Sequence, residues 1–167
     1  MKLIPHPGHP PLSVTAIDAE AWREGNRWHF RYVVDGTADL VMPDPAIPGR
    51  ADELWRTTCF EAFVGEEGAA YREYNFSPSR RWAGYAFDAP REGMRNAEAA
   101  VEVWLEGGDD WIAVEAAVST GLAPGAALGL TAVIEEERGR KSYWALAHTD
   151  GPPDFHAPSC FLARLPE

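Results

Sequence analysis

Short runs of alternating apolar and polar residues, separated by turn residues, recur along the whole chain. In the clearest run, residues 26–35, four large apolar side chains fall on one face of an extended strand. Similar runs predict about ten short strands, and no stretch sustains the apolar spacing of a helix. The pattern therefore predicts an all-β fold, a single-domain antiparallel β-sandwich of the jelly-roll or immunoglobulin-like type.

Hairpins are predicted where two such runs flank residues that favour turns. The predicted pairs are 101–105 with 111–118, 128–135 with 141–148, and 26–35 with 38–42, the last across Asp35-Gly36. A loop with three prolines, residues 42–50, then leads into the stretch that carries the candidate chemistry.

The two ends of the chain are predicted to belong to the same domain, which covers residues 1–167. Residues 1–11 contain four prolines and form an extended, Pro-rich lead-in. A first strand over 12–17, a helical turn over 18–24 capped by Asp18, and a last strand over 160–165 complete the expected elements.

Candidate ligand-binding residues gather between positions 54 and 85. In a strand over 59–64, Glu61 lies on the face opposite Phe60 and Ala62, and in a strand over 71–76, Glu73 and Asn75 share a face. If these strands pair, the two carboxyl groups and the amide become neighbours. The aromatic residues expected around them are Trp55, Phe63, Tyr71 and Trp82. Polar groups among aromatic side chains are typical of a small-ligand site.

Two interpretations of these polar residues remain open at this point. Glu61, Glu73 and Asn75 could accept hydrogen bonds from ligand hydroxyl groups, and a carboxylate pair could also catalyse glycoside hydrolysis. Alternatively, the carboxylates form structural ion pairs, for which the candidate partners are Arg31, Arg56 and Arg72.

The aromatic residues also allow two interpretations. Trp55, Tyr71, Trp82 and Trp144 could stack on the apolar face of a sugar ring, or they could pack in the core as most tryptophans of a β-sandwich do. Trp55 follows the Pro-rich loop at the start of a strand, so it is the one expected to be exposed.

Some histidine, methionine and cysteine residues are candidate metal ligands. Met94 and His148 could ligate haem iron, and Asp154 could orient His156 as a metal ligand or general base, but structural hydrogen bonding is the favoured interpretation. Cys59 and Cys160 are predicted to be buried thiols, and no CxxC or close His spacing indicates a metal site.

Charge and the amino terminus limit the partners. The net charge of −11 repels polyanions, so nucleic acid and anionic membranes are not expected partners. The N-terminal residues lack the apolar stretch of a secretory signal, and a cytoplasmic location is expected. No hydrolase, P-loop or dinucleotide-binding motif is present.

Several motifs together resemble the DOMON-like proteins, relatives of the family 9 carbohydrate-binding modules. They are Leu54-Trp55 with 59–63, then 73–78, Trp82 with Tyr85, 91–94, 142–148 and 154–156. The resemblance implies a β-sandwich that holds a sugar or haem b on one sheet face and its end loops. In the sugar-binding case Trp55, Glu61 and Asn75 would contact the saccharide, and in the haem-binding case Met94 and His148 would be the axial ligands.

The sequence is therefore interpreted as a non-catalytic module that binds a saccharide or similar polar ligand. A haem-binding redox module is the alternative, followed by a hydrolase. The predicted ligand-binding residues are Trp55, Arg56, Glu61, Tyr71, Glu73, Asn75, Trp82, Arg91, Trp144, His148 and His156.

Overall fold

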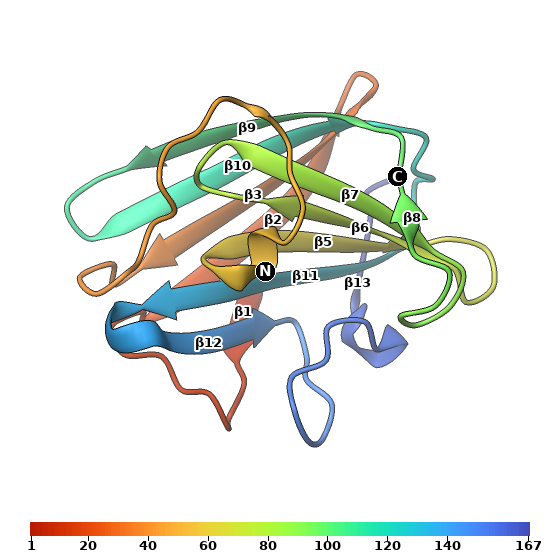
Figure 1. Ribbon diagram of the computed structural model, residues 1–167. Coiled ribbons are helices and arrows are strands. Elements are labelled where there is room, and N and C mark those ends of the chain that lie inside the picture. Colours follow the sequence, from red (N-terminus) through yellow and green to blue (C-terminus); the bar gives the residue numbers. More distant parts are fainter.

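The computed structural model describes residues 1–167 and consists of β-strands joined by turns and loops, without an α-helix (Figure 1). The first seven strands are β1 (Lys2–Pro5), β2 (Ala16–Glu24), β3 (Arg27–Asp35), β4 (Gly49–Arg50), β5 (Cys59–Gly65), β6 (Tyr71–Phe76) and β7 (Arg81–Phe87). The others are β8 (Arg95–Asn96), β9 (Ala100–Gly107), β10 (Trp111–Ser119), β11 (Ala127–Glu136), β12 (Arg140–Ala145) and β13 (Ala163–Arg164). None of the short helical turns has the length and apolar character needed to cross a bilayer.

All strands belong to one hydrogen-bonded sheet. Its order is β4-β7-β6-β5-β11-β12-β1-β2-β3-β10-β9, with β13 added beside β11 and β8 beside β7. Every pairing is antiparallel except that of β4 with β7, so the sheet is mixed. The all-β prediction is confirmed.

The sheet folds over on itself and encloses the main core between its two halves (Figure 1). The ring of Phe30 on β3 stacks on Phe76 of β6 with centroids 5.7 Å apart, and Tyr32 packs on Phe60 of β5 at 5.1 Å. Strands β7 and β9, near the two ends of the sheet, approach each other. The result is a nearly closed, barrel-like sheet in place of the predicted sandwich of two separate sheets.

Strand β1 is the reason that the two halves form one sheet. Ile4 of β1 pairs with Ala145 of β12, and Lys2 on the same short strand pairs with Asp18 of β2. Of the extended Pro-rich lead-in predicted over residues 1–11, Lys2–Pro5 form a paired strand. Proline lacks an N–H donor, but Pro5 lies at the end of the strand, where this costs little.

Two local predictions fail because tertiary pairing overrides the local signal. Residues 18–24 form the body of β2 and no helical turn, since β2 pairs with both β1 and β3 and buries Ile17 and Ala19. Residues 38–42 do not return along β3, whose two edges are occupied by β2 and β10. Only Leu40 makes an isolated bridge, to Glu136.

The remaining strand predictions are confirmed in whole or in part. The hairpins β9–β10 and β11–β12 form as expected. The last strand is shorter than predicted, because Cys160 lies in a helical turn, Pro158–Cys160, and only Ala163–Arg164 pairs with β11.

The buried carboxylate of Glu136 fixes the segment before β2. Its oxygens accept the backbone N–H groups of Leu12 (2.6 Å), Ser13 (2.6 Å) and Val14 (3.0 Å), which explains why these residues do not form a strand. Burial by itself would raise the pKa of Glu136, but the donated backbone N–H bonds outweigh it, and the pKa lies below its usual range.

Replacing this carboxylate should destabilise the protein. We expect Glu136→Gln to lower the free energy of unfolding by about 2–4 kcal/mol, because a charged acceptor shared by three N–H groups is lost. Because the folded-state pKa is lowered, this stabilisation is present above the unfolded-state pKa and disappears as the pH falls through the folded-state value.

Urea denaturation at neutral pH measures this effect. Glu137→Gln, at the exposed neighbouring position, is the matched control and should change the unfolding midpoint little. Equal midpoints for the two variants would show that Glu136 does not hold the segment.

Candidate functional site

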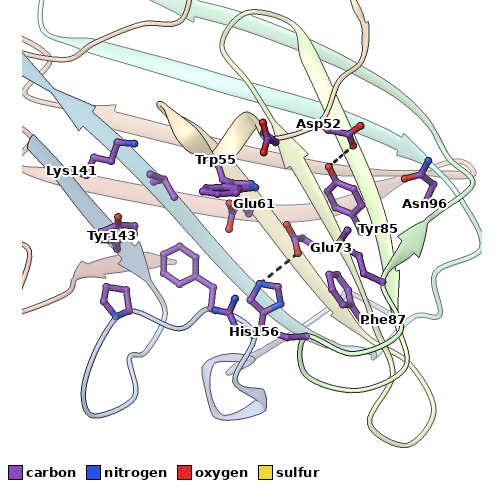
Figure 2. Close-up of a pocket in the computed structure, with 16 residues that line it drawn as sticks. Asp52, Trp55, Glu61, Glu73, Tyr85, Phe87, Asn96, Lys141, Tyr143 and His156 are labelled. Atoms are coloured by element: carbon purple, nitrogen blue, oxygen red, sulfur yellow. Dashed lines mark hydrogen bonds and ion pairs between the residues drawn. The ribbon is translucent and has the colours of Figure 1, made fainter. Parts of the chain in front are cut away.

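A cavity of about 720 Å³ opens on the outer face of the sheet, the face that points away from the main core. Its residues come from β5, β6, β7, β8, β11 and β12, from the loop and helical turn before β5, and from the loops after β7 and β12 (Figure 2). A smaller apolar cluster, which includes Phe63, Tyr71, Phe87 and Phe155, packs on the same face. The cavity therefore lies between the sheet and the loops that cover part of its outer side.

One glycine allows the C-terminal loop to lie close to the sheet. Gly129 of β11 faces outward opposite Phe63, and a Cβ atom there would lie 2.9 Å from the ring of Phe161. The Phe161 ring in turn packs against Phe63 and Tyr71. The absence of a side chain at position 129 thus helps to position the loop that carries Phe155 and His156.

The floor of the cavity is made by Glu61 and Glu73. The register of β5 and β6 sets Glu61 opposite Asn75 and Phe63 opposite Glu73, which confirms that the three polar residues are neighbours. The hydroxyl of Thr131 donates to Glu61 Oε2 at 3.0 Å, and the Asn75 amide donates to Glu73 Oε1 at 2.8 Å. The two carboxyl side chains are almost fully buried, with 3% and 6% exposure.

Burial without a cationic partner shifts the titration of both floor residues. Desolvation, reinforced by the neighbouring charge of Glu73, raises the pKa of Glu61 to about 8. Desolvation also raises the pKa of Glu73 to about 7, although the Asn75 hydrogen bond and the charge of Arg91 oppose it. The two carboxyl groups therefore share one negative charge more easily than they carry two.

The interpretation that these carboxylates form structural ion pairs is wrong. Arg31 pairs with Glu106 and Glu20, Arg56 with Glu53, and Arg72 with Glu66. No arginine or lysine lies within ion-pair distance of either floor carboxylate, and the one nearby basic group is His156, at 3.9 Å from Glu73.

A chain of hydrogen bonds fixes His156 beside Glu73. The backbone N–H of Arg91 donates to the hydroxyl oxygen of Tyr71 at 3.1 Å, and that hydroxyl lies 2.7 Å from Nδ1 of His156. Burial, and then the charge of Arg91, lower the pKa of His156 to about 4, so the ring is neutral at pH 7. The other ring nitrogen, Nε2, faces Glu73 at 3.9 Å (Figure 2).

Aromatic side chains form much of the wall, and Trp55 is the exposed one. It lies in the helical turn Leu54–Arg56, is 49% exposed, and has the Arg56 guanidinium 5.7 Å from its ring centroid. On the opposite side Tyr85 donates its hydroxyl to Asp52 at 2.7 Å (Figure 2). Hydrogen bonds from Arg50 and Tyr85 keep the pKa of Asp52 below its usual range.

The structure brings about half of the predicted site residues together. Those that line the cavity are Trp55, Glu61, Glu73, Arg91 and His156, together with Met94. Tyr71 and Asn75 lie beside the lining and hold His156 and Glu73 in place. Arg56 lies behind Trp55 and does not line the cavity.

Three predicted residues lie away from the cavity. Trp82 packs against the main core, because it pairs with Phe76 on the inward-facing side of the sheet. Trp144 is a buried core residue whose Nε1 donates to Ser142 at 2.9 Å. His148 donates from Nε2 to the backbone oxygen of Ile4 at 2.8 Å. The structure therefore does not place His148 in the cavity with Met94.

The other candidate ligands have ordinary surroundings. Cys59 and Cys160 are buried free thiols, as predicted. No group of three or more His, Cys, Asp or Glu residues is arranged to hold a metal ion.

Ten lining residues were not among the predicted ones. They are Asp52, Glu53, Tyr85, Phe87, Asn96, Val133, Lys141, Tyr143, Pro153 and Phe155. Alternation along the neighbouring strands could have indicated Tyr85 and Phe87, which share the outer face of β7 next to Glu73 and Tyr71 of β6. The loop residues Pro153 and Phe155 carry no such periodic signal.

Comparisons with known proteins give the fold only. Neither a protein-family model nor a curated protein matches the sequence. A crystal structure from Bacteroides uniformis, of a protein described as a putative carbohydrate-binding protein, matches with a TM-score of 0.62 and 16% sequence identity. The match covers 90% of this chain and 77% of that one. At this identity the similarity shows a shared all-β architecture.

Replacing the carboxyl group of Glu61 should favour the stability of the variant over that of the wild type more strongly as the pH rises. The folded-state pKa of Glu61, about 8, exceeds the unfolded value, so the folded state binds more protons between these values and loses stability as the pH rises. We expect the change in unfolding free energy caused by Glu61→Gln to be roughly 3 kcal/mol more favourable to the variant at pH 8 than at pH 5.

Urea denaturation of wild type and variant at the two pH values measures this difference. Glu20→Gln, at an exposed position on β2, is the control and should show no such pH dependence. A Glu61→Gln effect that is the same at pH 5 and pH 8 would contradict the raised pKa.

Proposed function

We propose that the protein is a non-catalytic binding module that holds a small saccharide, or a similar polar ligand, in the cavity on the outer face of the sheet. The observation that carries the proposal is the half-exposed ring of Trp55 beside a floor of buried hydrogen-bond acceptors that no protein cation neutralises. We further propose that the chain belongs with the DOMON-like proteins, a proposal supported by its motifs and by its all-β fold.

The chemistry of the cavity suits an amphipathic ring. A sugar presents an apolar face of C–H groups, which stacks on flat aromatic rings, and an edge of hydroxyl groups, which donate hydrogen bonds to carboxylates. Trp55 offers the flat ring, and Glu61 and Glu73 offer the acceptors. A volume of about 720 Å³ lies within the range of small-ligand pockets, roughly 300–1,000 Å³.

Loss of the Trp55 ring should abolish binding without unfolding the protein. Trp55 is half exposed and lies outside the main core, so Trp55→Ala should leave the melting temperature nearly unchanged. We expect affinity for any saccharide found in a thermal-shift screen to fall at least tenfold, because an exposed stacking surface is removed.

Isothermal titration of wild type and variant with that saccharide provides the test. Trp104→Ala is the matched control, since Trp104 has similar exposure on β9 and does not line the cavity. Unchanged affinity in Trp55→Ala would remove Trp55 from the site.

The haem alternative does not fit the pair of ligands that the resemblance implied. Of the two, only Met94 lines the cavity, and His148 is hydrogen-bonded to Ile4. We therefore expect the purified protein, with and without added haemin, to show no Soret band characteristic of axial ligation. A Soret band lost in Met94→Ala would instead favour a haem-binding module that uses a different histidine.

A further inference from the structure

The floor of the cavity lacks a positive charge. Glu61 is almost fully buried, and only its Oε2 atom receives a protein hydrogen bond, from Thr131. The Oε1 atom has no protein donor, although the residue lines the cavity. Glu73 faces only the Asn75 amide and the neutral ring of His156. A carboxylate buried in this way is costly unless a cation accompanies it.

The charged groups around the floor do not supply that cation. Asp52 is paired with Arg50, Glu53 with Arg56, and Arg91 with Asp154. Each of these cations is thus paired with another carboxylate, and none forms an ion pair with Glu61 or Glu73, although the charge of Arg91 acts on Glu73 from a distance.

Lys141 is the remaining lining cation. Its ammonium group donates to the backbone oxygen of Arg56, and no ion pair joins it to Glu61 or Glu73. The cavity therefore presents two carboxyl groups that no protein cation contacts, and a cationic ligand could pair with them.

The walls favour the same kind of ligand. Tyr85, Phe87, Tyr143, Phe155 and Trp55 all line the cavity. Aromatic rings attract a cation through their negative faces, and the attraction grows as the cation is removed from water. An aromatic wall above an uncompensated carboxyl floor is thus complementary to a positive charge on the ligand.

We infer that the ligand of this cavity carries a cationic nitrogen, such as the protonated amine of an amino sugar, which binds the carboxyl groups of Glu61 and Glu73. The inference rests on the proposed function and narrows its ligand class. An ammonium group has three N–H donors and no acceptor, so it can donate to Glu61 Oε1 and to Glu73 together. Binding favours the ionised carboxylates, and a proton that the pair held before binding leaves to the solvent.

Pairs of neutral and amino sugars that differ only in the amine show how much the amine contributes to affinity. The probes are glucose with glucosamine, galactose with galactosamine, and mannose with mannosamine, each titrated at pH 7 while the indole N–H signal of Trp55 is followed by NMR. We expect at least one amino sugar to bind about tenfold more tightly than its neutral partner, as a close charge pair gives. Titration calorimetry in buffers of different ionisation enthalpy should show net proton release.

Two variants test whether the preference for amino sugars depends on the carboxyl group of Glu61. Glu61→Gln keeps an acceptor oxygen and loses the charge, so it should weaken binding of the amino sugar more than binding of the neutral sugar and remove most of the preference. Glu20→Gln, on the exposed surface of β2, should keep the full preference. N-acetylglucosamine, which has an uncharged amide at the same ring position, should behave like glucose.

The outcomes distinguish the inference from the proposed function. Neutral and amino sugars that bind equally well would overturn the inference and leave the saccharide site standing. If no sugar binds, the proposed function fails.

In that case, choline and its uncharged isostere 3,3-dimethylbutan-1-ol test whether the cavity binds a positive charge alone. Binding of choline only, lost in Glu61→Gln, would support a cation site of another ligand class, and binding of neither would overturn both ideas.

Discussion

Side chains along β5 and β6 face the core and the outer side of the sheet in alternation, and both the fold and the site depend on this constraint. Phe60, Ala62 and Val64 face the enclosed core, so Glu61 and Phe63 must face outward. Because the C-terminal loop covers part of that outer face, these strands are buried on both sides. A slip of one residue in the register would bring a carboxyl group into the core and an apolar side chain to the cavity floor.

The two faces of the sheet have different roles. Strand β1 joins the two halves into one sheet, whose inner face encloses the main core, and the cavity lies on the outer face of β5, β6, β7, β11 and β12. Loops cover part of that face and leave the rest open as the cavity. Burial suppresses ionisation of the two floor carboxyl groups, so the protein tolerates them without a cationic partner. A cationic ligand would favour the ionised form and pair with it.

Networks around the floor hold its geometry. Thr131, Asn75 and the series Arg91–Tyr71–His156 fix the carboxyl groups and the imidazole through neutral hydrogen-bonding groups, since Arg91 contributes its backbone N–H. By contrast, Asp52 and Tyr85 on the wall are tied to the cationic Arg50. The wall is thus electrostatically balanced, and the floor is not.

The all-β class, two hairpins, and the grouping of Glu61, Glu73 and Asn75 could be predicted from the sequence, because each follows from period-2 alternation within a strand and its immediate neighbour. The fold was needed to show that Lys2–Pro5 joins the two halves, that Trp82 and Trp144 face the core, and that His148 lies apart from Met94. These depend on pairings between distant segments. Alternation shows which residues share a face, and it does not show which strand or loop comes to cover that face.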